Sequence, residues 1–287
     1  MFKPRTPHCA RALSAVVFTL ASLIGVLAFV SPFFVPRVAQ NTTGLGMQAQ
    51  SPLLLAALLV LSLTALVIEA QGQTMNAKII ALLGVLVAIN SALRFAETVL
   101  PGPGGFTPVF MLIILTGYVF GARIGFLMGA LSLLASAFIT GGVGPWLPYQ
   151  MFTSGWMGMT AGWLGRVGER ESGRMGELGS VFRLLTHSPL LPLILFSATW
   201  GFVYGAIMNL WSWPFQAGDP AQSWQAGLSA LDGLRRYAVF YVATSLWWDF
   251  FAAAGNVALI ALFGPPTLKA LTRFKRKFMF EEVAEGK

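Results

Sequence analysis

The sequence predicts an all-α integral membrane protein with about eight transmembrane helices. Three observations carry this prediction. The mean hydropathy of the 287 residues is +0.70. Only 10% of the residues are charged, whereas soluble domains carry about 25%. Long apolar runs also recur along the whole chain, each bounded by a polar or Gly/Pro-rich segment.

The apolar runs place the helices. The first run follows a basic tail that contains Lys3, Arg5 and Arg11. It is longer than a signal-peptide core of about 7–15 residues and no A-x-A site follows, so a retained helix is favoured over a cleaved signal peptide. The expected helices cover residues 12–34, 52–70, 77–97, 107–120, 124–140, 149–164, 189–211 and 237–263.

The connecting segments contain residues that end helices. Residues 100–105 read LPGPGG, and this density of proline and glycine excludes a helix. The GPP at 264–266 is predicted to stop the last helix. Residues 166–187 form a charged loop and residues 212–236 a long loop. The fourth and sixth expected helices are shorter than the roughly 20 residues of a normal span, which indicates a cavity rather than a uniform bundle.

These elements predict three parts. Residues 1–76 hold the tail and two additional transmembrane helices, residues 77–264 form a six-helix substrate-binding core, and residues 265–287 form a basic tail. We find no convincing internal repeat, which disfavours an inverted-repeat secondary transporter.

The basic residues predict the orientation. If the N-terminus is inside the cell, fifteen of the 19 lysines and arginines fall in inner segments. The four outer ones are Arg37, Arg94, Arg235 and Arg236. This bias predicts a multi-pass protein of the cell membrane with both termini cytoplasmic. It also explains the net charge of +8 without a nucleic-acid partner, since the basic residues cluster at the ends of apolar runs.

Catalytic motifs are absent from the sequence. It has no H-E-x-x-H, no G-x-S-x-G and no His/Cys cluster with metal-ligand spacing. Neither His8 nor His187 falls inside an apolar run. We therefore expect no catalytic residues, no metal and no cofactor. A G-x-x-x-x-G-K-[ST] motif is also missing, so ATP-driven transport requires another subunit to hydrolyse the nucleotide.

One stretch, Gly141–Trp163, has the composition of a ligand-binding wall. It begins with glycine and proline and continues as an uncharged helix rich in glycine, methionine and aromatic residues. Irregular backbone at membrane depth needs protein or a water-filled cavity around it. Apolar walls with a few polar groups suit a bulky organic ligand, although an interfacial aromatic belt also explains the aromatic residues. The predicted substrate-binding residues here and on the seventh helix are Trp146, Tyr149, Gln150, Thr153, Trp156 and Asn209.

Polar residues inside the apolar runs are further candidates, because such groups are costly in a membrane. Asn90 and Arg94 share one face of the third helix, and Arg94 can pair with Glu97. Asp249 is expected near the middle of the last helix, where Arg94 or Asn256 could be its partner. We predict that Asn90, Arg94 and Asp249 bind substrate. The alternatives are an interface pair of Arg94 with Glu97 that orients the third helix and a structural buried pair at Asp249.

Small residues form two stripes. Small-xxx-small spacing lets helices approach closely, within the chain or with a partner. On the third helix, internal packing and docking of a partner subunit both remain open for Ala77, Ala81, Gly84, Ala88 and Ala92. Around the fifth helix, internal packing is expected for Gly121, Gly125 and Gly129.

Residues 77–263 resemble the substrate-binding S component of energy-coupling factor (ECF) vitamin transporters. The resemblance rests on the six-helix core, on the AxxxA of Ala77 and Ala81, and on the run from Gly104 to Phe152. That run is similar to the subgroup associated with cobalamin uptake. The two additional N-terminal helices and the long 212–236 loop depart from the common pattern.

The resemblance implies a function and partners. S components capture a vitamin near the outer surface and associate with a transmembrane coupling protein and two ABC-type ATPases. Ala77 and Ala81 inherit the contact with the coupling protein. We predict cobalamin or a related corrinoid as the ligand, with the 212–236 loop as a lid. The alternatives are an S component for another vitamin or precursor, a stand-alone secondary transporter, and an intramembrane enzyme that uses Asp249.

Overall fold

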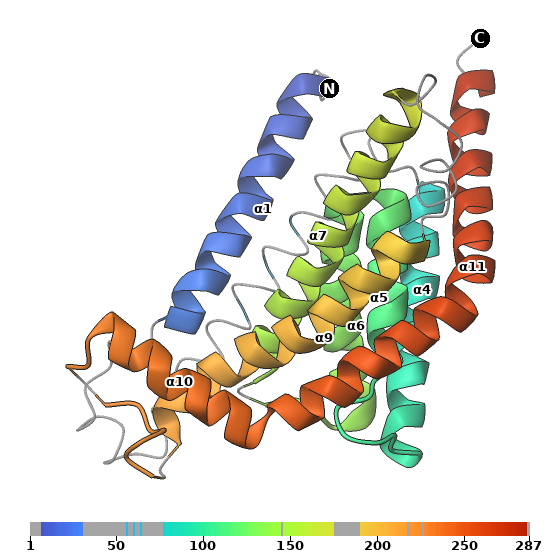
Figure 1. The fold of residues 1–287 in the computed structure, drawn as a ribbon. Helices are drawn as coiled ribbons and strands as arrows, with labels where there is room; N and C mark the ends of the chain where they lie inside the picture. The colour runs from blue at the N-terminus through green and yellow to red at the C-terminus, as the bar shows by residue number, and fades with distance from the viewer. Residues whose placement is uncertain are drawn as a thin grey trace.

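The computed structural model describes residues 7–30, 56, 60, 64, 77–144, 146–174, 190–216, 219–225 and 227–285. The regular structure of these residues is entirely helical, which confirms the predicted fold class (Figure 1). The α-helices are α1 (Pro7–Val30), α4 (Ala77–Val99), α5 (Val109–Phe120), α6 (Ala122–Thr140), α7 (Leu147–Arg174), α9 (Leu190–Ser212), α10 (Ala230–Thr244) and α11 (Leu246–Glu285), with a short 3-10 helix, η2, at Trp213–Phe215.

The helices run up and down, so the bundle has two distinct ends. The start of α1 and the end of α11 lie at the same end (Figure 1). The opposite end carries the 100–108 loop, the 141–146 turn and α10. We call this opposite end the mouth.

Four described helices are long and apolar enough to cross a membrane: residues 78–99, 122–140, 190–215 and 246–277. Two shorter apolar helices cover residues 16–27 and 109–120. The chain is therefore a multi-pass membrane protein. The expected helix at 52–70 lies outside the described residues, apart from helical residues at 56, 60 and 64.

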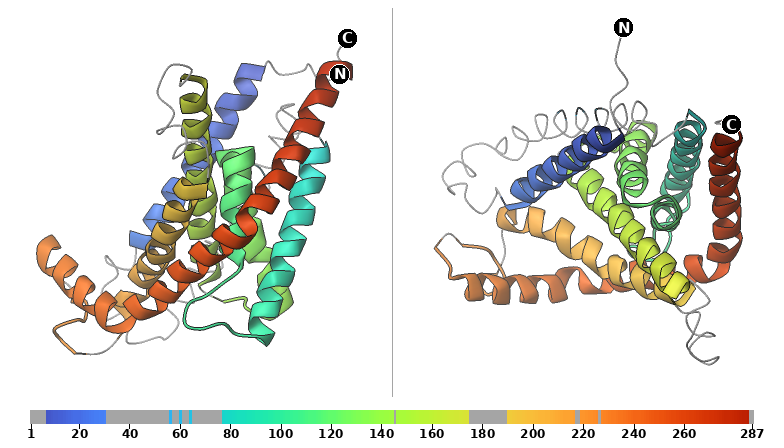
Figure 2. Two further views of the ribbon diagram at one scale, coloured as in Figure 1. Left: turned by 45° about the vertical axis from the view of Figure 1, so that its right-hand side comes forward. Right: turned by 90° about the horizontal axis from the view of Figure 1, so that it is seen from above.

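Helix α7 is the centre of the bundle, with α1, α5, α6 and α9 packed around it (Figure 2). Glycines allow its closest approaches. A β-carbon at Gly125 of α6 or at Gly117 of α5 would overlap the carbonyl oxygen of Gly158, and one at Gly129 would overlap that of Ser154. The expected internal packing of Gly125 and Gly129 is confirmed.

Gly121, the third glycine of that stripe, lies in the turn before α6 and contacts α7 through its backbone, because a β-carbon at Gly162 would overlap its carbonyl carbon. Its φ is +95° and it precedes α6, with nothing within 4 Å of the position a β-carbon would take. It is a turn glycine, because a residue with a β-carbon rarely adopts this backbone conformation.

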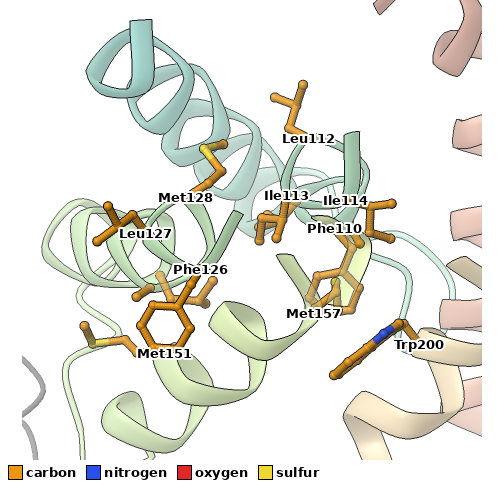
Figure 3. Packing of buried hydrophobic residues seen from close by; sticks show 14 of the residues in the cluster. Phe110, Leu112, Ile113, Ile114, Phe126, Leu127, Met128, Met151, Met157 and Trp200 are labelled. Carbon is orange, nitrogen blue, oxygen red and sulfur yellow. The ribbon is translucent and has the colours of Figure 1, made fainter. Parts of the chain in front are cut away.

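Large apolar side chains fill the space around these close contacts (Figure 3). They come from α5, α6 and α7, with Trp200 of α9 at the edge. All residues of α5 from Val109 to Gly117 are buried. A helix that is apolar on every side belongs inside a protein or a membrane, and α5 is enclosed by its neighbours α4, α6, α7, α9 and α11.

Two expected helix boundaries, the end of α7 and the start of α1, were wrong. Apolar patterns do not predict how far a helix continues beyond the apolar region. Helix α7 runs to Arg174, whereas a loop was expected from residue 166. Its extension contains no proline, and its glutamates and arginines favour helix. Helix α1 begins at Pro7, earlier than the expected residue 12.

The expected helix at 237–263 is two helices. A break at Ser245 separates α10 from α11. Ser229 caps α10, since its Oγ accepts from the backbone N–H of Asp232 at 3.1 Å, and this cap starts the helix inside the expected 212–236 loop. Helix α11 then continues through Pro265 and Pro266. It changes direction along its length (Figure 1), as expected when prolines kink a helix without ending it.

The close contact of α6 with α7 gives a stability prediction. Gly125→Ala should lower the free energy of unfolding in detergent by about 1–3 kcal/mol, because overpacking forces the two helices apart. Gly84→Ala on α4 is the matched control, since nothing lies within 4 Å of that position and alanine favours helix by about 1 kcal/mol. Thermal unfolding of the purified variants measures both. Equal effects of the two substitutions would contradict the packing.

Candidate functional site

The 100–108 loop is fastened to two helices at the mouth. The backbone N–H of Gly105 donates to the carbonyl of Trp248 in α11 at 3.2 Å. At the other side, the Thr107 hydroxyl donates to Oε2 of Glu97 in α4 at 2.6 Å. Thr107, not Arg94, is thus the partner of Glu97. The expected Arg94–Glu97 pair is not formed.

Asp249 is a buried carboxylate at the mouth. It lies in the first turn of α11, not in the middle of a helix, and is 8% exposed. Its Oδ2 accepts a hydrogen bond from the hydroxyl of Tyr241 in α10 at 2.7 Å. A β-carbon at Gly205 of α9 would overlap the carboxylate. Tyr241, not Arg94 or Asn256, is therefore its partner, and Gly205 provides the space.

Helix α9 approaches α11 through a small-residue face that the sequence analysis missed. Ser197, Gly201 and Gly205 are four residues apart and lie on this face. Asn256 of α11 donates from Nδ2 to the carbonyl of Ser197 at 3.1 Å, and Gly201 faces Ala253. The four-residue spacing of these small residues could have predicted the contact, because such spacing is typical of closely packed helices.

Tyr149 and Thr153 of α7 are buried beneath the mouth. The Tyr149 ring packs between Phe29 of α1 and Trp211 of α9, with ring centroids 5.0 and 4.8 Å away. The Thr153 hydroxyl donates to the carbonyl of Tyr149 at 2.8 Å and lies 3.7 Å from Sδ of Met208. Both side chains are thus occupied by contacts between α7 and its neighbours.

Trp156 belongs to the interface with α1. Its indole N–H donates to the hydroxyl of Ser22 at 3.3 Å, and its ring lies 5.8 Å from that of Phe29. It was expected near the outer boundary. The structure instead places it about two turns into α7, where an N-terminal helix covers it.

The other aromatic and amide residues of the predicted wall are less enclosed. Trp146 is 43% exposed and donates from its indole N–H to the carbonyl of Gly142 at 3.1 Å. Gln150 and Asn209 are half-buried. The predicted residues therefore surround the mouth end of α7 and α9 but do not line one open cavity.

Three polar side chains from three helices are buried without hydrogen-bond partners. They are the amide of Asn90 in α4 and the hydroxyls of Thr116 in α5 and Ser154 in α7. All three residues are 0% exposed, and each lies about two turns from the mouth end of its helix. An unsatisfied buried group costs about 1–3 kcal/mol. Thr116 and Ser154 were missed because single hydroxyls in apolar helices usually bond to their own backbone.

We call the side chains of Asn90, Thr116 and Ser154 the polar layer. Arg94 lies about one turn nearer the mouth than Asn90 on α4 and is half-buried. Tyr204 of α9, a residue that the sequence analysis did not single out, packs its ring 4.6 Å from that of Phe110 in α5. Its hydroxyl lies near that of Ser154 without the geometry of a hydrogen bond.

The segment expected to be a lid is folded. Trp213, Trp224 and Phe240 form a small core of their own, with Tyr237 packed against it. The Tyr237 hydroxyl donates to the carbonyl of Ala206, which fastens α10 to α9. Arg236 donates to the Pro220 carbonyl at 2.8 Å and also reaches that of Ser223. We call this unit, residues 213–244, the cap.

The small-residue face of α4 is open. Helix α4 begins at Ala77, and the side chains of Ala81, Ala88 and Ala92 are exposed together with Gly84. Within the described residues no part of the bundle packs over this face. The side chains of α4 that face the bundle are instead Leu83, Leu86, Asn90 and Ser91.

The described part of the chain contains no group of three or more His, Cys, Asp or Glu that could hold a metal ion. The arrangement at the mouth offers neutral polar groups, aromatic rings and one tyrosine-bonded carboxylate. Such a set can bind and orient a ligand.

Comparison with known proteins gives one match. The family model described as "ECF transporter, substrate-specific component" matches residues 78–264, which is more than half of the chain. No curated protein and no solved structure matches. The matched range begins in α4 and ends within α11, so it includes the mouth and the cap but not α1. The chain belongs to the family of substrate-specific components of ECF transporters.

Proposed function

We propose that this chain captures cobalamin or a related corrinoid at the mouth and delivers it inward as part of an ATP-driven importer. Members of its family are transporter subunits rather than enzymes. The observation that carries the proposal of a ligand site is the layer of buried, unpartnered polar groups formed by Asn90, Thr116 and Ser154. Unpartnered buried groups lower the stability of the folded chain, and a ligand that forms hydrogen bonds with them would offset this loss on binding.

The chemistry of these groups favours a neutral polar ligand. An amide and two hydroxyls both donate and accept hydrogen bonds. The rim of a corrinoid carries primary amides, which also do both. Arg94, Glu97 and Asp249 are half-buried or buried charged side chains near the mouth, and Glu97 and Asp249 are already bonded to Thr107 and Tyr241. A multiply charged ligand would find few counter-charges.

Access to this layer requires aromatic side chains to move. Tyr149 and Trp211 close the space between α7 and α9, and Phe29 covers Tyr149 from α1. We propose that Trp146, Tyr149, Gln150, Thr153, Trp156 and Asn209 line the path or the site once the two helices separate. The cap is fastened to α9 at Ala206, so it is placed to move with that helix as a lid.

The positions of the basic residues support an outward-facing mouth. Lys78, Arg123 and Arg166 lie near the end that holds the termini, as does the basic part of α11. By the positive-inside rule this end is cytoplasmic. A ligand arriving from outside the cell then meets the mouth first.

The open face of α4 supports a docked partner. Small residues let a second helix approach closely, and Ala81, Gly84 and Ala88 have no such helix against them within the described residues. We propose that Ala77 and Ala81 contact a transmembrane coupling protein, which links the chain to two ABC-type ATPases.

Titration of the purified chain tests the ligand. We expect saturable binding of cobalamin or cobinamide and at least about tenfold weaker binding of riboflavin and thiamine, which is a difference of about 1.4 kcal/mol. Isothermal calorimetry in detergent measures it. Binding of neither corrinoid would refute the ligand assignment, and tight binding of riboflavin or thiamine would show an S component for another vitamin.

Ala81→Trp tests the docking face. The indole should block approach of the coupling protein, so co-purification and ATP-dependent uptake should fall by at least about tenfold while ligand affinity stays unchanged. Leu262→Trp on α11 is the control, because Leu262 is 70% exposed and lies outside the proposed face. If Ala81→Trp instead impairs ligand binding, the face packs within the protein.

A further inference from the structure

Helix α9 turns an aromatic face toward the core. Trp200, Tyr204 and Trp211 follow one another at intervals of four and seven residues, which places them on one side of the helix. Trp211 packs on Tyr149 of α7, with ring centroids 4.8 Å apart. Tyr204, in the middle of this face, packs on Phe110 of α5, with ring centroids 4.6 Å apart. The ring of Tyr204 is therefore held between α9 and α5.

The hydroxyl of Tyr204 lies near that of Ser154 in α7, but the two do not have the geometry of a hydrogen bond. A serine inside a helix usually donates to a carbonyl of its own helix. The preceding residue, Thr153, does so, since its hydroxyl donates to the carbonyl of Tyr149 at 2.8 Å. The Ser154 hydroxyl is buried and makes no such bond. Two hydroxyls from neighbouring helices thus lie close together without bonding to each other.

Tyr204 also lies at the depth of the polar layer. It is about two turns from the mouth end of α9 at Ser212. Asn90, Thr116 and Ser154 are equally far from the mouth ends of α4, α5 and α7. Helix α5 packs against α4, α7 and α9, so all four side chains come from α5 and helices around it. Tyr204 therefore brings α9 into the polar layer.

We propose that Tyr204 binds the ligand directly, and that its hydroxyl and that of Ser154 together hold one primary amide of the ligand. The inference rests on the function proposed above, because it takes a corrinoid as the ligand. A primary amide both donates and accepts hydrogen bonds, and so does a hydroxyl. One hydroxyl donates to the amide oxygen while the other accepts from the amide nitrogen, so the pair binds the amide without a charge.

The surroundings of Tyr204 suit this role. Its side chain is half-buried, so its hydroxyl is open to a ligand that enters from the mouth. The contact with Phe110 holds the ring in place before the ligand arrives. A group that is already fixed loses little conformational entropy on binding. A purely apolar ligand would leave the hydroxyls of Tyr204 and Ser154 unbonded.

Tyr204→Phe tests the contact, because it removes the hydroxyl and keeps the ring that packs on Phe110. We expect the affinity of the full chain in detergent for cobalamin and for cobinamide to fall about five- to tenfold, since one hydrogen bond to the ligand is lost. The unfolding temperature of the ligand-free chain should not fall, because the hydroxyl has no bond with Ser154 to lose. Isothermal calorimetry and thermal unfolding measure the two quantities.

Tyr118→Phe is the matched control. Tyr118 lies near the other end of α5, where its hydroxyl comes within 3.3 Å of the position that a β-carbon at Gly168 of α7 would take. This substitution also removes one tyrosine hydroxyl from the bundle, but away from the mouth. The affinity for both corrinoids should be unchanged.

A double-mutant cycle tests whether the two hydroxyls share one amide. Ser154→Ala alone should weaken binding about five- to tenfold, like Tyr204→Phe. If both hydroxyls hold the same group, the double variant should lose less affinity than the product of the two single losses. Losses that multiply in full would show that the hydroxyls contact the ligand independently, which contradicts the shared amide.

The outcomes separate this contact from the proposed function. Full corrinoid affinity in Tyr204→Phe, with binding by the unaltered chain, would refute the contact and leave the proposed function standing. A fall in affinity together with a fall in the unfolding temperature would show that the hydroxyl supports the fold instead. An unaltered chain that binds neither corrinoid would refute the proposed function and this contact with it.

Discussion

Backbone contact between α6 and α7 is the constraint on which the rest of the bundle depends. Gly125 and Gly129 of α6 lie directly against the carbonyls of Gly158 and Ser154. Without a strong hydrophobic force between helices in a bilayer, this close packing is a main source of association. It leaves no room for a ligand between α6 and α7. A binding site must therefore lie between other helices, toward an end of the bundle, or between the core and an outer helix.

At the mouth, hydrogen bonds between different elements hold the structure together. Thr107 joins the 100–108 loop to α4, and Gly105 joins the same loop to α11. Tyr241 pairs with the buried Asp249, which fits only because Gly205 has no side chain. These contacts explain why charged groups persist at membrane depth. Among the described residues, the side chains of Asn90, Thr116 and Ser154 and Oδ1 of Asn256 remain buried without hydrogen-bond partners.

The additional helix α1 changes the surroundings of residues that spacing alone placed in a pocket. Phe29 covers Tyr149, and Ser22 bonds to Trp156. The same helix packs Phe18 against Phe126 of α6, with ring centroids 5.4 Å apart. An N-terminal segment outside the family match thus contacts the core at two levels, one near the mouth and one nearer the termini.

The sequence predicted most of the helices because apolar length and Gly/Pro breaks are local properties. It failed at the end of α7 and at Pro265, where helices continue beyond the local signal, and at the break before α11. Among the buried polar residues, it singled out Asn90 and Asp249 from the cost of polar groups in a membrane. It could not give the partners Tyr241 and Gly205, since those contacts depend on which helices become neighbours. For the same reason Trp156 was assigned to the mouth, although its helix turns it toward α1.

The central claim is that the unpartnered polar layer is kept for a ligand. The cobalamin affinity and the thermal stability of Asn90→Leu, measured together, test it most directly. Leucine has a similar size and removes two unsatisfied buried groups, so stability should be equal or higher. Affinity should fall by at least about tenfold, because ligand hydrogen bonds are lost. Unchanged affinity, or a loss of stability without a loss of affinity, would contradict the account.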